Sequence, residues 1–294
     1  MPELPEVETV RLGLARLLPG RQVAGVEFDW PKSFPNASAD VREFVVGAEV
    51  TGVKRRAKVL LIELSTNYSL VIHLKMTGQL VLRSSSEKFG AGHPSESLIG
   101  RLPDKSTRVT INFADGSQLF FNDQRKFGWM RLIPTTEVMN LDFFKKVGPE
   151  PLSADFTWQV MRYRMLRRQN SNIKAVLLDQ TVLAGVGNIY ADEALWGAKI
   201  HPATSVKQLS AAQVHKLYDE LIFVLKLSIE KGGSTNKNYV NAEGKKGSYM
   251  SFARVFRREG QACPRHPDSL IIKTRVAGRG THLCPRCQKL KPVS

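Results

Sequence analysis

The sequence is poor in cysteine and in long apolar runs. Only three cysteines occur among 294 residues, and all lie within the last 32 positions. A disulfide framework is therefore disfavoured, and a metal site near the C-terminus is the better interpretation of the thiols. No run of 18 apolar residues exists, and the chain does not open with a basic segment followed by an apolar one. We therefore expect an intracellular protein with neither a membrane span nor a signal peptide.

Acidic residues are scarce relative to basic ones. The 43 Lys and Arg residues outnumber the 27 Asp and Glu residues, which gives a formal net charge of +16. This excess favours a polyanionic partner, with nucleic acid ahead of an anionic membrane. The apolar content of 42% is ordinary for a globular protein, and the length suffices for two or three domains.

Hydrophobic periodicity divides the chain into a β-rich part and a helical part. Residues 3–18 predict an amphipathic helix, because Val7, Val10, Leu14 and Leu17 share one stripe. Short apolar runs between 22 and 133, with the alternating "TRVTINF" before the turn "ADGS", predict a β-sandwich. The Ser-, Gly- and Pro-rich stretch 83–106 is expected to be a long surface excursion.

Helical patterns follow the linker "KVGPEPLS", in "DFTWQVMRYRMLRR", "NIKAVLLDQ" and "NIYADEALWGA". Ser210 and Gln213 predict a capping box for a further helix, which Gly232 and Gly233 end. We predict an α+β protein with an N-terminal β-sandwich and helix, a helical helix-two-turn-helix domain and a C-terminal zinc-finger β-hairpin. The expected divisions are a sandwich at 1–135, a linker at 136–152, helices at 153–233, a mobile loop at 234–250 and the zinc hairpin at 251–294.

The C-terminal cysteines have metal-ligand spacing. Cys263-x2-His266 is followed after 17 residues by Cys284-x2-Cys287, and such paired knuckles suit one tetrahedral, structural Zn²⁺. Three unrelated buried thiols are the alternative. His282 is a rival fourth ligand, but it breaks the symmetry of the second knuckle, so His266 is preferred. Because so short a tail cannot build its own core, the metal would supply folding energy.

The opening "MPELPEVETV" has two interpretations. A small residue such as Pro2 permits removal of the initiator methionine, which would leave a free secondary amine. The plainer interpretation is a helix start, with Pro5 in the first turn and carboxylates near the positive end of the helix dipole.

The segment "LLDQTVLAGVGNIYADEAL" predicts two helices joined by a glycine-bearing turn. Gly185 and Gly187 would let the backbone approach a ligand closely, and Asn188 begins the second helix, where free N–H groups favour an anion such as a DNA phosphate. A plain helical hairpin with Asn188 as its cap is the alternative.

Taken in order, these motifs resemble the formamidopyrimidine-DNA glycosylase / endonuclease VIII family of bifunctional DNA repair enzymes. The likeness covers essentially the whole chain and includes "PELPEVE", "RRAKVLL", "HLKMTGQL", "NDQRKFG", "GPEPL", "IKAVLLDQ" and "GVGNIYADEALW". The leucine in "PELPE" is typical of the formamidopyrimidine branch. The resemblance implies removal of oxidised purines from DNA and cleavage of the abasic site. Excision of oxidised pyrimidines, or zinc-hairpin binding of nucleic acid without catalysis, are the alternatives.

The resemblance also implies the catalytic residues. Pro2 matches the nucleophile that attacks C1′, and Glu3 matches the residue that handles protons beside it. Glu6 assists by a hydrogen bond within the same turn or only complements the helix dipole. Lys58 matches a lysine that contacts phosphate, although alone it would be taken for an exposed strand lysine. Arg279, flanked by glycines at an expected hairpin tip, matches an arginine that grips phosphates.

Further positions match DNA contacts of the family. Met76, Arg125 and Phe127 match the residues that fill the stack after base extrusion, although burial would be the usual interpretation of the methionine and the phenylalanine. Lys174 matches a lysine near phosphate or lesion, and Tyr239 lies in the loop that covers the everted base. The implied partner is duplex DNA with oxidised bases or abasic sites, bound by a monomer. A prokaryotic chain would be cytoplasmic and associated with the nucleoid.

Four departures from the family pattern leave the nucleophile intact and bear on base preference, and one of them is the 83–106 excursion, which is longer than in the compact members. His266 stands where the family has a second cysteine, which Cys3His sites tolerate. Lys75 replaces a usual glycine, and the text "DKSTRV" lacks a histidine common at that place.

Overall fold

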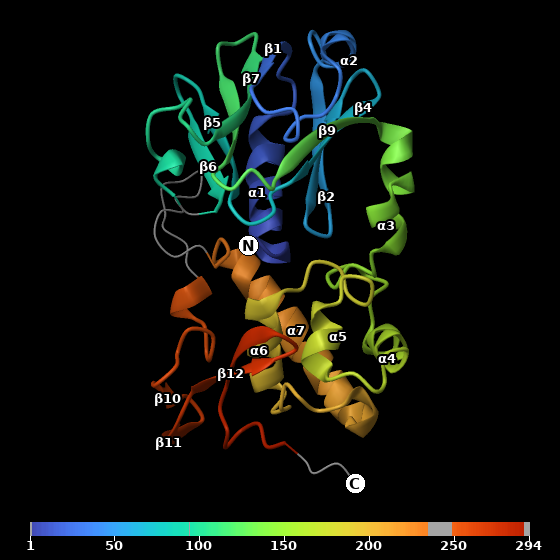
Figure 1. Ribbon diagram of the computed structural model, residues 1–294, viewed down its shortest axis with the longest axis vertical. Coiled ribbons are helices and arrows are strands. Elements are labelled where there is room, and N and C mark those ends of the chain that lie inside the picture. The colour runs from blue at the N-terminus through green and yellow to red at the C-terminus, as the bar shows by residue number, and fades with distance from the viewer. Residues whose placement is uncertain (1, 94, 235–248, 291–294) are drawn as a thin grey trace. The chain divides into compact units, whose positions relative to one another are not determined.

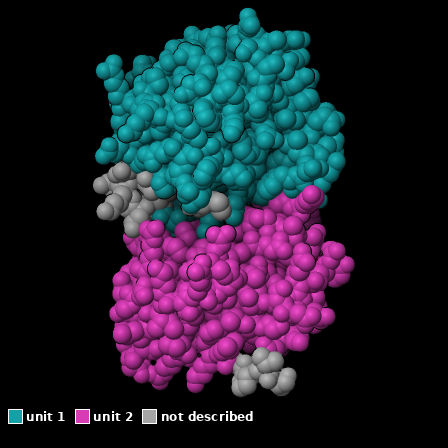
Figure 2. All heavy atoms as spheres, in the orientation of Figure 1, with its two compact units in different colours: residues 1–145, 229–249 teal, residues 146–228, 250–294 magenta. Residues whose placement is uncertain are grey.

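The computed structural model describes residues 2–93, 95–234 and 249–290. The chain forms two compact units, one of residues 1–145 with 229–249 and the other of residues 146–228 with 250–294 (Figure 2). Among the described residues, no helix is long and apolar enough to cross a bilayer.

The first unit contains the predicted β-sandwich (Figure 1). Its two sheets are antiparallel, with the strand orders β1-β7-β8-β5-β6 and β2-β3-β4-β9. The strands are β1 (Val23–Phe28), β2 (Val50–Arg56), β3 (Val59–Leu64), β4 (Tyr68–His73), β5 (Gly78–Arg83), β6 (Lys88–Gly92), β7 (Thr107–Phe113), β8 (Gln118–Asp123) and β9 (Trp129–Pro134). The helical elements are α1 (Leu4–Leu17), α2 (Ser38–Phe44), η1 (Glu96–Leu98) and η2 (Thr135–Asn140), with α3 (Asp142–Lys146) at the unit's end.

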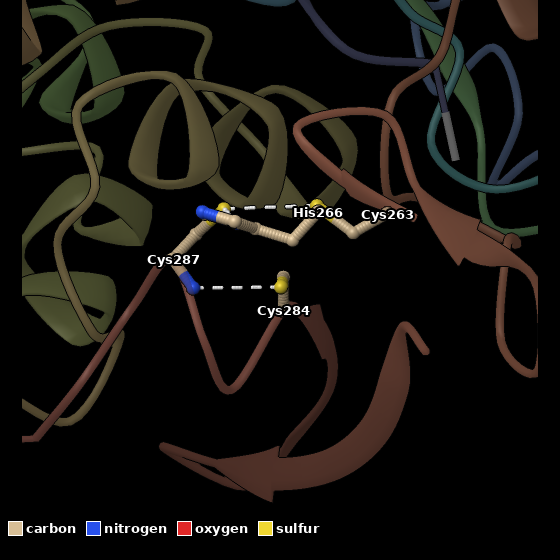
Figure 3. Close-up of side chains that lie close together, drawn as sticks. All are labelled: Cys263, His266, Cys284 and Cys287. Carbon is tan, nitrogen blue, oxygen red and sulfur yellow. Dashed lines mark hydrogen bonds between the residues drawn. The ribbon is translucent and has the colours of Figure 1, made fainter. Parts of the chain in front are cut away.

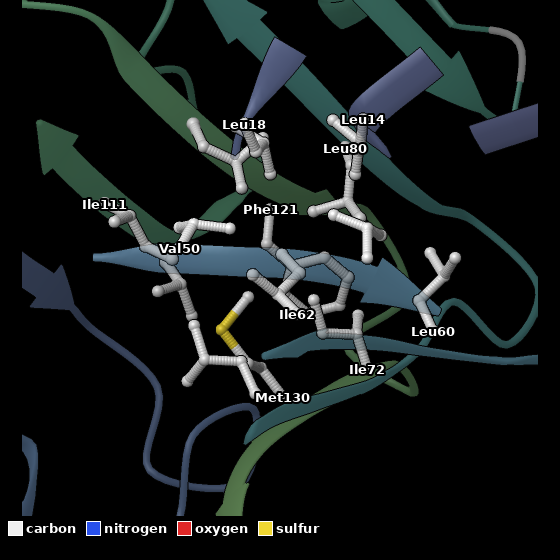
Figure 4. Close-up of a cluster of buried hydrophobic side chains, with 14 of the residues drawn as sticks. Leu14, Leu18, Val50, Leu60, Ile62, Ile72, Leu80, Ile111, Phe121 and Met130 are labelled. Carbon is white, nitrogen blue, oxygen red and sulfur yellow. The ribbon is translucent and has the colours of Figure 1, made fainter. Parts of the chain in front are cut away.

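Apolar side chains from both sheets form one core (Figure 4). Ile62 and Ile72 from one sheet and Leu80 and Phe121 from the other are at most 1% exposed. The predicted stripe of α1 joins this core, and α1 packs against β2, β3 and β6. This packing holds the start of the chain against the sandwich.

The stretch 83–106 is not the surface excursion that its composition predicts. It contains β6 and η1, and Phe89 and Leu98 are 2% and 3% exposed. The ring of Phe89 occupies the place that a side chain at Gly13 of α1 would need. The prediction failed because the glycines of "KFGAG" were interpreted as signs of a loop, whereas a Cβ at Gly92 would lie 2.5 Å from the Gly78 carbonyl oxygen, so this glycine allows β6 to approach β5 closely.

The second unit contains the predicted helices and two zinc-associated hairpins. Its elements are α4 (Trp158–Leu166), α5 (Ile173–Leu178), α6 (Asn188–Gly197), η3 (Val206–Gln208), most of α7 (Ala211–Glu230), η4 (Tyr249–Ser251), β10 (Ala262–Cys263), β11 (His266–Leu270), β12 (Ile272–Val276) and β13 (Arg279–Leu283). The capping box before α7 is confirmed, because Ser210 and Gln213 exchange hydrogen bonds of 3.1 and 3.2 Å. Gly232 ends α7 with a φ of 75°.

Candidate functional site

The first turn of α1 buries two carboxylates immediately after Pro2. Glu3 is the N-cap of α1 and forms a capping box with Glu6. The Glu3 N–H donates to Glu6 Oε2 at 2.8 Å, and the Ser234 N–H donates to Glu6 Oε1 at 2.8 Å. Glu3 and Glu6 are only 4% and 6% exposed, and Pro2 is buried. Glu6 therefore fixes both the start of the chain and the segment that follows α7.

Lys58 lies in the tight turn between β2 and β3. Arg56 pairs with Val59, so the turn consists of two residues, and Ala57 has a φ of 53°. Lys58 is 6% exposed, so the interpretation as an exposed strand lysine is wrong. Arg55 ties the turn to α1, because its guanidinium donates to Glu8 Oε2 and to the Ala57 carbonyl, each at 2.7 Å.

The Glu8 carboxylate, which accepts from Arg55, is kept ionised by its neighbours. Burial raises the pKa of Glu8, but the hydrogen bonds and charges of Arg11 and Arg55 outweigh it and hold the pKa below the ordinary value. The Glu8–Arg55 ion pair therefore persists through the neutral range, and it couples the helix of Glu3 to the turn of Lys58.

His73 is a neighbour of Lys58 that the sequence interpretation missed. It is the last residue of β4 and pairs with Val59. Burial, with the positive charges of Lys75 and Lys58, lowers the pKa of His73 to about 3. Its Nδ1 accepts the Lys75 N–H at 3.0 Å. His73 is thus a neutral imidazole, and only the strand register, which a single sequence does not reveal, places it here.

Met76, Arg125 and Phe127 form one exposed group on the sandwich. Arg125 lies 3.0 Å from Met76 Sδ, and its guanidinium carbon is 4.7 Å from the centre of the Phe127 ring. Met76 is 40% exposed and Phe127 is 52% exposed. Burial under the sandwich, the alternative for both side chains, is therefore excluded.

Asp123 holds the two loops that carry this group. Its carboxylate is completely buried and accepts the Thr77 hydroxyl from one loop. From the other loop it accepts the Arg125 N–H at 3.2 Å and the Gly128 N–H at 2.6 Å. Asp123 is a second site residue that the sequence interpretation missed, although it stands in the motif "NDQRKFG".

In the second unit, α5 and α6 form the predicted helix-two-turn-helix. Gly185 has a φ of 77°, and Gln180 organises the turn by accepting the Gly185 N–H at 2.9 Å. Asn188 is the first residue of α6 rather than its cap, which is Gly187. The Asn188 side-chain amide donates to the Gly280 carbonyl at 2.9 Å, so it binds the zinc hairpin.

Lys174 is completely buried, so its ammonium has no exposed surface to offer a phosphate. Its Nζ donates to Asp192 Oδ1 at 2.7 Å, to Thr281 Oγ1 at 2.6 Å and to the Gly280 carbonyl at 3.2 Å. The direct DNA contact predicted for Lys174 is at odds with this burial. The reason is that partners up to 107 residues away in the chain occupy the ammonium.

Arg279 lies at the hairpin tip that the sequence predicts. Ala277 and Gly278 form a two-residue turn with φ values of 52° and 71°, and Arg279 pairs with Val276. Positive φ at both positions is the geometry of a type I′ turn, which suits twisted hairpins. Arg279 is exposed, and the next two residues are those held by Lys174.

The C-terminal ligands converge as a Cys3His cluster (Figure 3). The ligand atoms of Cys263, His266, Cys284 and Cys287 all lie within 4.8 Å of one another. Cys263 Sγ is 3.6 Å from Cys287 Sγ, close to the separation of about 3.8 Å that tetrahedral zinc with Zn–S bonds of about 2.3 Å requires. His282 does not belong to this cluster, and its ring Nδ1 lies 3.4 Å from Asp192 Oδ2 instead.

Tyr239 lies outside the described residues, as does most of the loop expected at 234–250. The predicted roles of this segment stay predictions.

The described features define a class of zinc-containing helix-two-turn-helix proteins. Such a protein combines a β-sandwich, with carboxylates at the start of its first helix, and a helical unit that contains a helix-two-turn-helix and a zinc hairpin. Family models match in that order. "Formamidopyrimidine-DNA glycosylase N-terminal domain" matches residues 1–130, "Formamidopyrimidine-DNA glycosylase H2TH domain" residues 147–239, and "Zinc finger found in FPG and IleRS" residues 269–290. With the Cys3His cluster, the last match supports one structural zinc ion.

Full-length relatives agree. A formamidopyrimidine-DNA glycosylase of Pelotomaculum thermopropionicum is 40% identical, over 99% of this chain and 100% of its own. One from Streptococcus pyogenes serotype M3 is 41% identical over the same shares. The Lactococcus lactis Fpg, in complex with DNA containing an abasic site, has a TM-score of 0.85 and 36% identity over 98% of this chain and 100% of that one. The chain belongs to the formamidopyrimidine-DNA glycosylase family.

Proposed function

We propose that this protein removes oxidised purines, including 8-oxoguanine and formamidopyrimidines, from duplex DNA and then cuts the abasic strand. The observation that carries the proposal is the buried capping box of Glu3 and Glu6 directly after Pro2. A helix start needs an N-cap, but it does not need two carboxylates removed from water, because burial of charge is costly. This arrangement suits proton transfer next to the chain's amine.

Pro2 is the nucleophile in this proposal, once Met1 has been removed. An α-amino group has an ordinary pKa near 8, so a useful fraction is neutral at pH 7, whereas lysine, near 10.4, would need strong desolvation. The amine nitrogen bonds to C1′ as the bond from C1′ to the damaged base breaks, and the proton that the nitrogen loses is balanced by the proton that the departing base gains. Glu3 delivers a proton to the sugar ring oxygen, which opens the ring and leaves an iminium on Pro2.

The iminium then drives strand cleavage. It acidifies the C2′ proton, and loss of this proton expels the 3′ phosphate by β-elimination. A second, δ-elimination expels the 5′ phosphate. Lys58 supports this chemistry through phosphate contact and proton delivery, and neutral His73 beside it adds no competing charge. Glu6 is a positioning residue, because its two oxygens already accept the N–H groups of Glu3 and Ser234.

The second unit supplies the phosphate grip. Arg279 at the hairpin tip contacts the DNA backbone, and the N-terminus of α6 at Asn188 offers N–H groups to a further phosphate. Lys174 acts through Arg279: its hydrogen bonds to Gly280 and Thr281 fix the strand that follows the tip. Its role is therefore positioning rather than contact.

Met76, Arg125 and Phe127 enter the stack when the damaged nucleotide is extruded. Their mutual contacts and exposure suit a wedge that replaces a base. Tyr239 is proposed to cover the extruded base. A prokaryotic chain would act in the cytoplasm, on the nucleoid.

The test is a cleavage panel with two forms of the protein. Protein with a free Pro2 amine is expected to cut duplexes containing 8-oxoguanine, formamidopyrimidine or an abasic site, and to cut thymine glycol more slowly. Protein that retains Met1 should bind the same duplexes but cut none of them. Equal cleavage by both forms would refute the nucleophile, and preference for thymine glycol would favour the pyrimidine-specific alternative.

A further inference from the structure

The second unit has a cavity of about 310 Å³ whose lining is mostly cationic. Lys146, Arg164, Arg167 and Arg168 surround it, and Thr181 and Val182 complete the lining. The cavity's size is at the lower end of small-ligand pockets. Within the described part of the chain, no carboxylate lines it.

The chain brings Lys146 to this cavity through a close backbone contact. The Gly148 N–H donates to the Gln180 carbonyl at 2.8 Å, and the Ala184 N–H donates to the Pro149 carbonyl at 3.0 Å. A side chain at Gly148 would place its Cβ 2.6 Å from the Val182 carbonyl oxygen. Only glycine permits this approach, so the segment that follows Lys146 is fixed against the turn between α5 and α6.

The three arginines come from the end of α4. Arg167 is the C-cap of α4, where the helix dipole favours a cation. That effect falls off within one turn and does not explain why Lys146, from another element, lines the same cavity. Arg164 donates to the Thr181 carbonyl at a long 3.4 Å, which leaves most of its guanidinium donors for a ligand.

The nearby acid does not neutralise the cluster. Asp179 approaches Arg168 through Oδ2 at 3.6 Å across a half-exposed contact, while its Oδ1 accepts the N–H and the hydroxyl of Thr181 at 2.9 and 2.7 Å, so one carboxylate at most offsets one of the four cations. Four cations thus face one cavity beside a carboxylate that is already partly occupied. Such convergence suits a multiply charged anion with several acceptor oxygens.

We propose that this cavity binds backbone phosphates of duplex DNA, at a place separate from the Arg279 tip and the start of α6. Thr181 and Val182 lie in the segment between α5 and α6, the same segment that leads into Asn188. A duplex presents a row of phosphates, so one motif can hold two of them. This inference rests on the proposed function in one respect, namely that the multiply charged anion bound by the cavity is DNA.

The experiment compares undamaged duplex binding at increasing salt for three variants. The cavity variant is Arg164→Gln/Arg167→Gln/Arg168→Gln, and the control with the same charge change replaces the exposed Arg42, Lys207 and Lys226 by Gln. The slope of log K against log[salt] is negative, and its magnitude is expected to decrease by about 0.9 for each phosphate that the cavity variant no longer neutralises. The control should keep the wild-type slope. The variant Arg164→Lys/Arg167→Lys/Arg168→Lys, called the all-Lys cavity variant, should retain most of the magnitude of the wild-type slope.

Equal slopes for the cavity variant and the control would overturn the proposal. A parallel titration with inorganic phosphate, in which the unfolding temperature is measured, tests whether the cavity binds a small phosphorylated ligand instead of DNA. If phosphate stabilises the wild type but not the cavity variant while the DNA slopes stay equal to the control, the cavity takes a small phosphorylated ligand and the DNA assignment is wrong. Binding to undamaged duplex breaks no bond, so this result is independent of the excision chemistry. Circular dichroism and zinc content identify a variant that has not folded. If the Gln variant has not folded, the salt dependence of the all-Lys cavity variant, which keeps the positive charge, is compared with that of the wild type instead.

Discussion

Replacing Lys174 with Met tests whether the buried lysine positions Arg279. Lys174 and Asp192 are both completely buried, and their charged atoms are 2.7 Å apart. Methionine has a similar length but cannot donate, so Asp192 would be left as a buried charge. Removal of one partner of such a pair costs about 3–5 kcal/mol. We expect a loss of this size in the free energy of unfolding, measured by urea denaturation.

A second substitution separates the charge from the shape. In Lys174→Met/Asp192→Asn, the asparagine can still accept the His282 N–H but carries no charge. The double variant should be less destabilised than the sum of the two single variants by about 0.5–3 kcal/mol. The exposed Lys207→Met is the matched control and should change stability by no more than about 0.5 kcal/mol. Simple additivity of the two single effects would show that the pair is not coupled.

DNA binding distinguishes positioning from contact. If Lys174 acts through the hairpin tip, Lys174→Met and Arg279→Gln should each weaken binding, and the two together should weaken it no more than Arg279→Gln alone. If Lys174 itself grips a phosphate, the two effects should add. Additive effects would refute the positioning role even if the stability results hold.

Three other predictions follow from the described geometry. In Asp123→Asn one carboxylate oxygen is replaced by an amide nitrogen, so the side chain cannot accept both the Arg125 N–H and the Gly128 N–H as the carboxylate does. Base extrusion, measured by 2-aminopurine fluorescence, should therefore slow, while cleavage at a preformed abasic site should change little. Equal slowing of both steps would contradict the role of Asp123 in holding the two loops. Because the pKa of His73 is lowered to about 3, the unfolded chain takes up a proton as the pH falls below 6.5 and the folded one does not. The wild type should therefore lose about 1.6 kcal/mol of stability between pH 6.5 and 5 that His73→Gln does not lose, and parallel stability curves of the two proteins would contradict this. Elemental analysis should find one zinc per chain in His282→Ala and none in Cys284→Ser, whereas absence of zinc from His282→Ala would make His282 a ligand.

Local patterns predicted the elements well, because their causes lie within a few residues. The stripe Val7, Val10 and Leu14 became the buried face of α1, and the spacing of the C-terminal ligands became the Cys3His cluster. The resemblance to the family also named Met76, Arg125 and Phe127, which the structure brings together. In each case a short motif contains the whole signal.

Long-range contacts are what the sequence did not reveal. Lys58 and Lys174 are lysines in amphipathic surroundings, and propensity places both at the surface. The first is nevertheless buried although it lies in a two-residue turn, and the second is buried against Asp192 and the zinc hairpin. His73 and Asp123 gain their importance from strand register and loop packing, which depend on pairings across the sandwich. Such partners become visible only in the folded chain.

Reductive trapping tests the central assignment most directly. Borohydride reduces an iminium between enzyme and sugar to a stable amine, and mass spectrometry of the digested adduct locates it. We predict that the sugar remnant is attached to the N-terminal peptide, on the nitrogen of Pro2. A remnant on Lys58 or on any other side chain, or no covalent adduct during active cleavage, would contradict the account.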